Sequence, residues 1–350
     1  MIYLIGWGIL YLMFFLTGLA GNRTRLFIAI SLIVFMVFSV MRGAVGTDTA
    51  NYELIVEGFS ADYVWGGMEP GFVLLGKALL SVSDSGVIAV RVLSFLIFAM
   101  LFLYLGRADK NERFLLIAYI LPTFVYQYSM NGLRIGLAAM LLLLATQNVR
   151  QLRYKSGMVL AVSALLFHYS SLVSLLFIWA SWSRWLKTSN VLVVPFVVCA
   201  LLFLLSLNGD YFLAKLLYYQ DSESRNPLSG LSKVGVLLLF VAALFFSKLP
   251  NAEKTKLIVL GAGFTISFWL VSAVSYAGLR FLDLISFAFP VAILLTYSRL
   301  ALKFDTTIKL AFIMAGVLSA ASGYRNFVAE EGIGPSPFMP YHFIGFPNGD

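Results

Sequence analysis

The sequence predicts an all-α integral membrane protein, and three observations support this fold class. Of the 350 residues, 60% are hydrophobic and only 12% are charged, whereas a soluble domain is about half apolar and about a quarter charged. Apolar stretches fill nearly the whole length, so a single integral membrane domain is the simplest interpretation. Basic residues recur in alternate connecting segments, a pattern typical of cytoplasmic loops.

Twelve apolar segments are expected to span the membrane. Because no Lys or Arg precedes the first segment, it is interpreted as a retained span rather than a cleaved signal peptide. The expected spans are 2–20, 26–41, 86–106, 114–128, 135–149, 158–169, 171–183, 191–207, 233–247, 257–277, 281–298 and 309–322. Residues 71–83 are apolar but short and contain Lys77, which predicts an external amphipathic helix lying on the membrane surface.

The basic residues set the expected orientation. Six alternate loops carry most of the Lys and Arg residues and few acids, so the positive-inside rule places these loops in the cytoplasm. Both termini are then external, and the formal net charge of +8 reflects topology rather than nucleic-acid binding. The assignment fails if 71–83 spans the membrane or if 158–183 is one long helix.

Two regions follow from this assignment. Residues 1–322 are expected to form a single multi-span membrane domain. Residues 323–350 are rich in proline and are expected to form an external, extended tail.

Several kinds of site are excluded. Cys199 is the only cysteine, which excludes disulfides and cysteine-rich metal sites. A zinc site needs about three protein ligands, and the chain has only two distant histidines, so no metal is expected. No Walker A motif or convincing GxGxxG is present, so no nucleotide cofactor is expected.

Basic and titratable side chains gather at one expected external boundary. Arg42 ends the second span, Arg134 opens the fifth, and Arg280 lies between the tenth and eleventh. His168 lies in the turn between the sixth and seventh. These two spans have room for only about 20 Å each at about 1.5 Å per residue, short of a ~30 Å hydrocarbon core. His168 is therefore expected in a depression that opens to the external side.

Arginines around such a depression suit a phosphorylated lipid, because Arg binds phosphate oxygens bidentately and stays charged. Gly132 precedes Arg134 and can break the chain, so an anion would meet a helix N-terminus and an Arg together. The alternative is an arginine that snorkels to lipid headgroups.

His168 is a candidate general base, because neutral imidazole is available near pH 7. The alternative is a hydrogen-bonded packing residue. In the first external loop, Asp48 and Glu69 are candidates for a base, a metal ligand or an acceptor of sugar hydroxyls. Tyr52 and Asn131 are candidates for sugar binding, although an interfacial aromatic belt explains most of the chain's aromatic residues.

Four motifs together resemble a known family. They are "RGAVGTDTANY" at 42–52, "EPGF" at 69–72, "SMNGLRIGLA" at 129–138 and "HYSSL" at 168–172. In this order and spacing they are similar to the EpsG-type family of bacterial polysaccharide proteins, which is related to the Wzy-type O-antigen and capsule polymerases. The resemblance covers about residues 1–300, and the tail after about residue 325 matches nothing.

The resemblance implies a GT-C-like glycosyltransferase of the bacterial inner membrane, with its active site facing the periplasm. Its substrates would be oligosaccharide repeats on undecaprenyl pyrophosphate, and a chain-length regulator and a flippase would be its partners. Arg42, Arg134 and Arg280 would hold the pyrophosphate without a metal. His168 is the first choice of base, with Asp48 or Glu69 second.

Three other functions stay open. An O-antigen ligase-like enzyme would share the donor but use a different acceptor. A lipid-linked glycan flippase or transporter would carry charged or broken helices near the midplane, where only Arg91 is a clear candidate. A scaffold in an assembly complex is the third.

Overall fold

The chain forms helices that divide into two compact units. The computed structural model describes residues 1–19, 24–59, 67–182, 230–329 and 336–345. Unit 1 contains Met1–Tyr63, Glu69–Ser171 and Lys303–Asp350, and unit 2 contains Val64–Met68 and Leu172–Leu302. Across the described ranges, strand pairing is limited to an isolated antiparallel bridge between Arg42 and Phe343.

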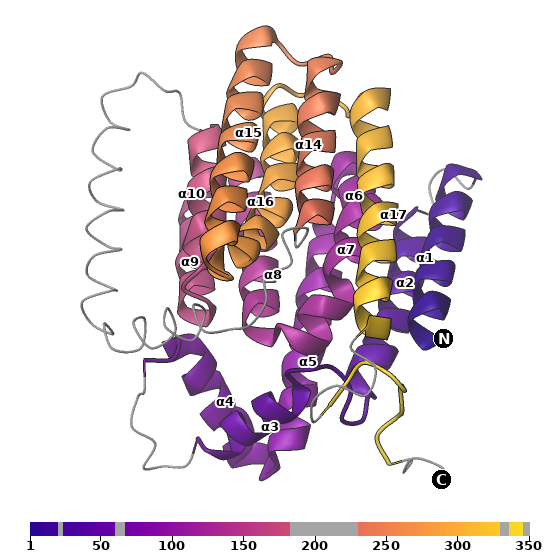
Figure 1. The fold of residues 1–350 in the computed structure, drawn as a ribbon, viewed down its shortest axis with the longest axis vertical. Coiled ribbons are helices and arrows are strands. Elements are labelled where there is room, and N and C mark those ends of the chain that lie inside the picture. Colours follow the sequence, from indigo (N-terminus) through magenta and orange to yellow (C-terminus); the bar gives the residue numbers. More distant parts are fainter. Residues whose placement is uncertain (20–23, 60–66, 183–229, 330–335, 346–350) are drawn as a thin grey trace. The chain divides into compact units, whose positions relative to one another are not determined.

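Unit 1 is built on a series of apolar helices that pack on one another. These are α1 (Ile2–Leu19), α2 (Thr24–Val40), α5 (Gly86–Arg107), α8 (Leu133–Arg150), α9 (Tyr154–Phe167) and α17 (Thr306–Ala329). Helix α1 packs on α2, α2 on α5, α5 on α8, and α8 on α9. Two shorter helices, α3 (Thr49–Glu57) and α4 (Pro70–Ser83), pack together and against α5, as Figure 1 shows.

One helical segment of unit 1 is irregular. It runs through α6 (Lys110–Leu115), the π-helix η2 (Leu116–Ile120), α7 (Leu121–Tyr126) and the π-helix η3 (Gln127–Asn131). The segment ends at Gly132, where φ is −95° and ψ is 61°, and α8 starts at the next residue. The sequence correctly predicts a chain break here. π-turns in helices often mark functional sites, and η3 ends at Asn131.

Unit 2 contains α10 (Ser171–Trp182) apart from its first residue, α14 (Leu231–Phe245), α15 (Asn251–Val274) and α16 (Ala277–Arg299). The last three pack on one another, and α16 is buried over most of its length. Helix α10 joins this group through Phe177, whose ring packs edge-on against Phe264 and Phe289.

The helices agree with the predicted spans. Each predicted span coincides with helical residues over most of its length, except 191–207, which lies outside the described residues. Among the described residues, five helices are long and apolar enough to cross a membrane, and six apolar helices are shorter. Residues 71–83 do form a helix, α4. The structure therefore shows an all-α membrane protein, while the number of twelve spans stays a prediction.

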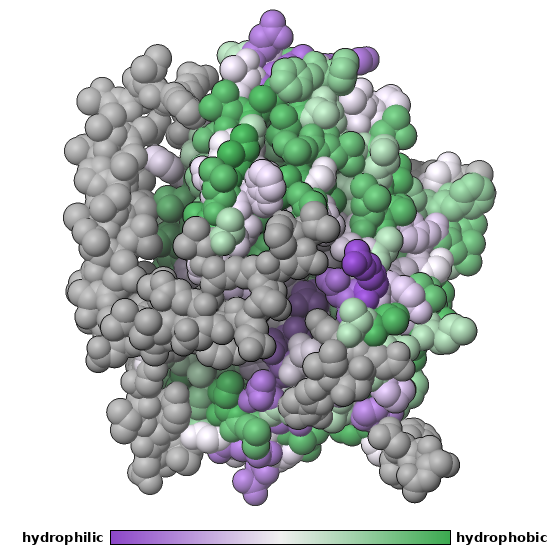
Figure 2. All heavy atoms as spheres, viewed as in Figure 1, coloured by the Kyte–Doolittle hydropathy of each residue, from purple (hydrophilic) through white to green (hydrophobic). Residues whose placement is uncertain are grey.

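Apolar side chains also cover much of the outer surface. Large hydrophobic residues are exposed along α1, α15 and α17, as at Phe15, Leu270 and Leu318. Figure 2 shows that hydrophobic residues dominate the visible face of the helices. Soluble proteins rarely expose apolar surface on this scale, so a lipid environment explains it best.

The sequence predicts that residues 323–350 form an external, extended tail, and the structure describes two parts of this region. Helix α17 continues to Ala329, beyond the expected span end at residue 322. Residues 336–345, which we call the C-terminal segment, pack against residues 41–50 of unit 1. The C-terminal segment, which contains Pro337 and Pro340, is therefore docked on unit 1.

A buried charge cluster closes the turn between α5 and α6. Asp109 and Glu112 form a capping box at the start of α6. Arg150, in the last turn of α8, forms ion pairs with both carboxylates, and the Glu112 side chain is only 2% exposed. Arg150 therefore neutralises a carboxylate that is almost fully removed from water.

The variant Arg150→Met should lower the free energy of unfolding by about 3 kcal/mol, because it leaves the Glu112 charge buried without its cation. Denaturant unfolding of the purified protein in detergent measures this difference. Arg153→Met is the matched control, since Arg153 is exposed. Equal losses in the two variants would contradict the assignment.

Candidate functional site

The helical hairpin α8–α9 brings Arg134 and His168 to the same end of unit 1. Arg134 is the second residue of α8, and His168 is the residue that ends α9. The two helices are joined by a short turn and pack along each other. Because an antiparallel hairpin places the start of its first helix beside the end of its second, these two side chains become neighbours.

Helix α4 brings Glu69 to the same end. Glu69 has an extended backbone and precedes Pro70, which is well suited to the first helical position. A Cβ at Gly71 would lie 2.9 Å from the backbone oxygen of Leu166 in α9. Only a glycine there lets α4 approach α9 this closely, and the approach is what places Glu69 beside His168.

A single carboxylate joins the three motifs. Glu69 Oε2 accepts a hydrogen bond from the Arg134 guanidinium at 2.6 Å, and Glu69 Oε1 lies 3.1 Å from His168 Nδ1. The Glu69 side chain is 1% exposed, whereas those of Arg134 and His168 are 20% and 16% exposed. Arg134 and His168 are therefore partly accessible, whereas the carboxylate that binds both of them is buried.

The surroundings of Glu69 fix its charge and the tautomer of His168. Burial alone raises the pKa of a carboxyl, but the hydrogen bond with His168 and the charge of Arg134 outweigh it and lower the pKa of Glu69 to about 2. An ionised carboxylate is only an acceptor, so His168 Nδ1 carries the proton and donates it. In neutral imidazole, Nε2 is then the basic nitrogen.

Two aromatic rings hold the Arg134 guanidinium. Its central carbon lies 6.0 Å from the centre of the Tyr52 ring and 5.8 Å from that of Phe72, and the two rings pack edge-to-face. The Tyr52 ring is buried. Tyr52 thus supports Arg134, and its role in sugar binding stays a prediction.

Asp48 and Asn131 are neighbours, and Asn131 lies three residues before Arg134. The Asp48 backbone N–H and the Thr47 hydroxyl both donate to Asn131 Oδ1, at 2.7 and 2.9 Å. Asp48 precedes α3 but its side chain does not cap that helix. The amide oxygen of Asn131 therefore orders the loop, and neither a sugar-binding role for Asn131 nor a catalytic role for Asp48 is tested by these contacts.

Arg42 is placed differently from the other candidates. Its side chain is fully buried and donates to Ser94 Oγ at 2.9 Å and to the Met130 carbonyl at 3.1 Å. Arg91 donates to the Arg42 carbonyl and pairs with Glu53 at 2.9 Å. This geometry favours a role for Arg42 in ordering the loop, and its contact with a pyrophosphate stays a prediction.

Arg280 belongs to unit 2. It lies in the first turn of α16, and its guanidinium carbon is 5.3 Å from the centre of the Tyr276 ring. Nearby in the same unit, Lys233 pairs with Asp283 at 2.6 Å. The pyrophosphate role of Arg280 also stays a prediction.

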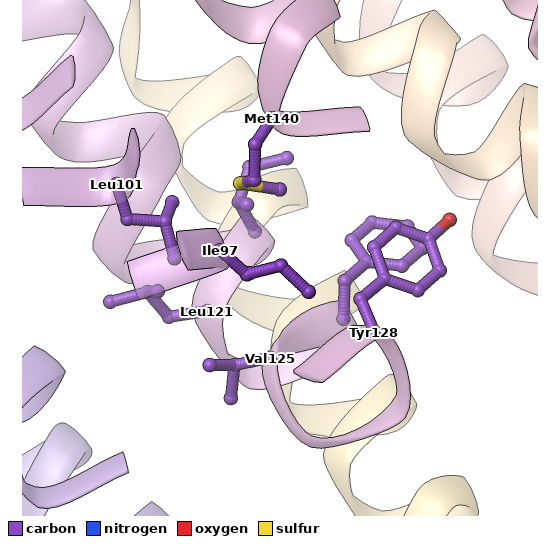
Figure 3. A pocket seen from close by; sticks show the side chains of 8 residues that line it. Ile97, Leu101, Leu121, Val125, Tyr128 and Met140 are labelled. Atoms are coloured by element: carbon purple, nitrogen blue, oxygen red, sulfur yellow. The ribbon is translucent and has the colours of Figure 1, made fainter. Parts of the chain in front are cut away.

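An apolar crevice lies in unit 1 between α5, α7 and α8. Figure 3 shows Ile97, Leu101, Leu121, Val125, Tyr128 and Met140 around it. Its lining contains no Asp, Glu, His, Lys or Arg, and Tyr128 is its one ionisable side chain. Within the described part of the chain, no cluster of three His, Cys, Asp or Glu residues could hold a metal ion either.

Sequence reasoning did not predict that Phe72 supports Arg134 or that Arg91 pairs with Glu53. Phe72 stands in "EPGF", two helical residues after Pro70, and it supports Arg134 from below. A charge inside an apolar span, such as Arg91, is itself a signal, because it requires a partner. Here that partner is Glu53, together with the carbonyls of the loop after α2.

Fold and site together define an all-α membrane protein with an arginine and a histidine held by one buried carboxylate. The model of the EpsG family matches residues 3–343, so this chain belongs to the EpsG family. At the family level it is a polysaccharide polymerase-type, glycosyltransferase-like membrane protein.

The family match extends through the C-terminal segment, which corrects the expectation that the resemblance ends near residue 300. Neither the comparison with curated proteins nor the comparison with solved structures gave a significant match.

Glu69→Gln should lower the free energy of unfolding, and the size of the loss should depend on pH. The pKa of Glu69 in the folded protein, about 2, lies below the value of about 4.3 in an unfolded chain. Its ionisation therefore stabilises the fold above about pH 4.3, by about 3 kcal/mol, and this contribution is lost as the pH falls toward 2.

Unfolding of wild type and Glu69→Gln from about pH 3 to pH 7 measures this contribution. The difference in unfolding free energy between wild type and Glu69→Gln should be largest at neutral pH and should decrease at acidic pH. Glu57→Gln, at an exposed position on α3, should show no such trend. A gap that is constant across the range would contradict the ion pair.

Proposed function

We propose that this protein polymerises oligosaccharide repeats carried on undecaprenyl pyrophosphate, at a site that faces the periplasm of a bacterial cell. The observation that carries this proposal is the Glu69 carboxylate, which holds Arg134 and His168 side by side. One glycan is released from its lipid and joined to the non-reducing end of another. This reaction needs a base for the acceptor hydroxyl and a cation for the leaving group.

His168 is the proposed base. With Nδ1–H held by Glu69, Nε2 accepts the proton of the acceptor hydroxyl as its oxygen attacks the anomeric carbon of the donor. The carboxylate orients the ring, fixes its tautomer and stabilises the imidazolium that forms. A carboxylate plays the same part beside the histidine of catalytic triads. Glu69 is therefore better suited to positioning His168 than to serving as a base itself, because its low pKa makes it a weak one.

Arg134 is the proposed partner of the leaving group. The bond between the anomeric carbon and the pyrophosphate oxygen breaks, and the electron pair leaves with the pyrophosphate. A guanidinium has five N–H donors, so an ion pair with Glu69 does not exhaust it. Arg134 can then stabilise the developing charge without a metal. The start of α8 adds backbone N–H groups close by.

The remaining candidates complete the proposed site. Asp48 and Asn131 lie beside one another, and Asn131 precedes Arg134 by three residues. Both would bind sugar hydroxyls. Arg42 would support the loop, and the pyrophosphate role of Arg280 remains a separate prediction. A GT-C-like arrangement of twelve spans, a chain-length regulator and a flippase are the remaining parts of this proposal.

Three variants test the proposal in liposomes that contain the purified protein and a lipid-pyrophosphate-linked repeat unit from the source organism. Wild type should give a ladder of polymers on a gel. His168→Gln should keep a hydrogen bond to Glu69 but lose the base, which should lower the rate about 10²- to 10⁴-fold. Arg134→Ala should also abolish the ladder, and Glu69→Gln should reduce it.

Arg107→Ala is the matched control, because Arg107 is an exposed arginine at the end of α5. It should polymerise like wild type. A wild type that moves the lipid across the bilayer without forming polymer would favour a transporter. A wild type that transfers the glycan only to a different acceptor would favour a ligase. Full activity in His168→Gln would rule out His168 as the base.

A further inference from the structure

The C-terminal segment pairs with the loop that follows α2. Arg42 and Phe343 form an antiparallel bridge. The Gly43 N–H donates to the His342 carbonyl at 2.8 Å, and the Ile344 N–H donates to the Met41 carbonyl at 2.9 Å. A Cβ at Gly43 would lie 2.3 Å from the His342 ring, so a larger residue at this position would have to displace that side chain.

Ser336 forms hydrogen bonds at the start of α3 and in the loop before it. Its hydroxyl donates to the Gly46 carbonyl at 2.7 Å and accepts a hydrogen bond from the Ala50 N–H at 3.3 Å. The first N–H groups of a helix have no partner within the helix, and a preceding Ser, Thr or Asp usually supplies one. Here the residue before the helix, Asp48, makes no such bond with its side chain. A fully buried serine from the other end of the chain takes that role.

Aromatic contacts hold the C-terminal segment in place. The Phe338 side chain is buried and stacks on Phe327 of α17, with ring centres 4.0 Å apart. The Tyr3 hydroxyl donates to the Phe338 carbonyl at 2.9 Å, and the Tyr341 hydroxyl donates to the Phe38 carbonyl at 2.6 Å. The segment is therefore anchored on α1, α2 and α17 independently of its contacts with the loop.

The loop in turn contacts the residues that open α8. Thr47 and Asp48 both donate to Asn131 Oδ1, and Arg42 donates to the Met130 carbonyl. Asn131 lies three residues before Arg134. A second connection runs along α3, whose Tyr52 ring lies beneath the Arg134 guanidinium.

We propose that the C-terminal segment positions the catalytic site, with Ser336 as its central positioning residue. Ser336 fixes the start of α3 and the 44–48 loop. The loop fixes Asn131, and α3 fixes the Tyr52 ring. Asn131 and Tyr52 together hold Arg134 in position. Ser336 acts through the 44–48 loop and α3, so it is a positioning residue rather than a catalytic one. This inference rests on the proposed function for its activity readout, but its structural part stands apart from it.

Hydrogen–deuterium exchange and polymer formation, measured on the full-length protein, test this inference together. Ser336→Ala should raise amide exchange in residues 44–57 and 128–136 about tenfold, the size expected from the loss of a helix cap and local opening. Polymer formation should fall by a similar factor, while exchange in unit 2 stays unchanged. Ser336→Thr keeps the hydroxyl and should restore both readouts.

Phe338→Ala is the second variant, because it removes the anchor on α17 and leaves Ser336 in the chain. It should raise exchange in the same two stretches. Ser81→Ala, at an exposed position on α4, is the matched control and should behave like wild type.

The outcomes separate this inference from the proposed function. If wild type forms no polymer, the proposed function fails, and exchange alone decides the positioning role. Unchanged exchange in Ser336→Ala overturns the inference. It is also overturned if exchange rises only in 44–57 while 128–136 and polymer formation stay as in wild type, or if Ser336→Ala unfolds the whole protein.

Discussion

The candidate site depends on one buried carboxylate. Glu69 is almost completely removed from water, and its two oxygens are bound by Arg134 and His168. Removing a charge from water is costly unless partners compensate for it, so each of the three groups constrains the others. The same interaction fixes the proton on His168 Nδ1 and holds the Arg134 guanidinium over Tyr52 and Phe72. Glu69 thereby brings three separate sequence motifs into one cluster, from which we propose a base, a cation for the leaving group and an orienting group.

Much of the fold could be predicted because the local amino-acid composition shows where membrane helices form. Long apolar runs and the loops between them locate α1, α2, α5 and the later helices, since a chain in lipid must satisfy its backbone within helices. Helix ends were less predictable. Helix α15 begins at Asn251, ahead of the predicted 257, because polar first turns such as "NAEKTK" are helical without being apolar. The π-turns before Gly132 have no comparable signature in the sequence.

The residues of the candidate site could be selected from the sequence, but their contacts could not. Arg134, His168 and Glu69 could each be selected because a charged or titratable residue near an apolar span needs an explanation. Their mutual contacts could not be predicted, since they depend on how α4 packs across the end of the α8–α9 hairpin. The buried position of Arg42 has the same origin. Its sequence position suggested an external cation, but packing of the 41–50 loop on α5 and on the C-terminal segment encloses it.

The most direct measurement is an electron cryo-microscopy structure of the full-length protein with a non-transferable analogue of the lipid-pyrophosphate-linked repeat. The account predicts the pyrophosphate within hydrogen-bonding distance of the Arg134 guanidinium. It also predicts that His168 Nε2 faces the space beside the anomeric carbon, with Nδ1 still on Glu69. A pyrophosphate bound away from Arg134, with His168 turned from the anomeric carbon, would contradict the account.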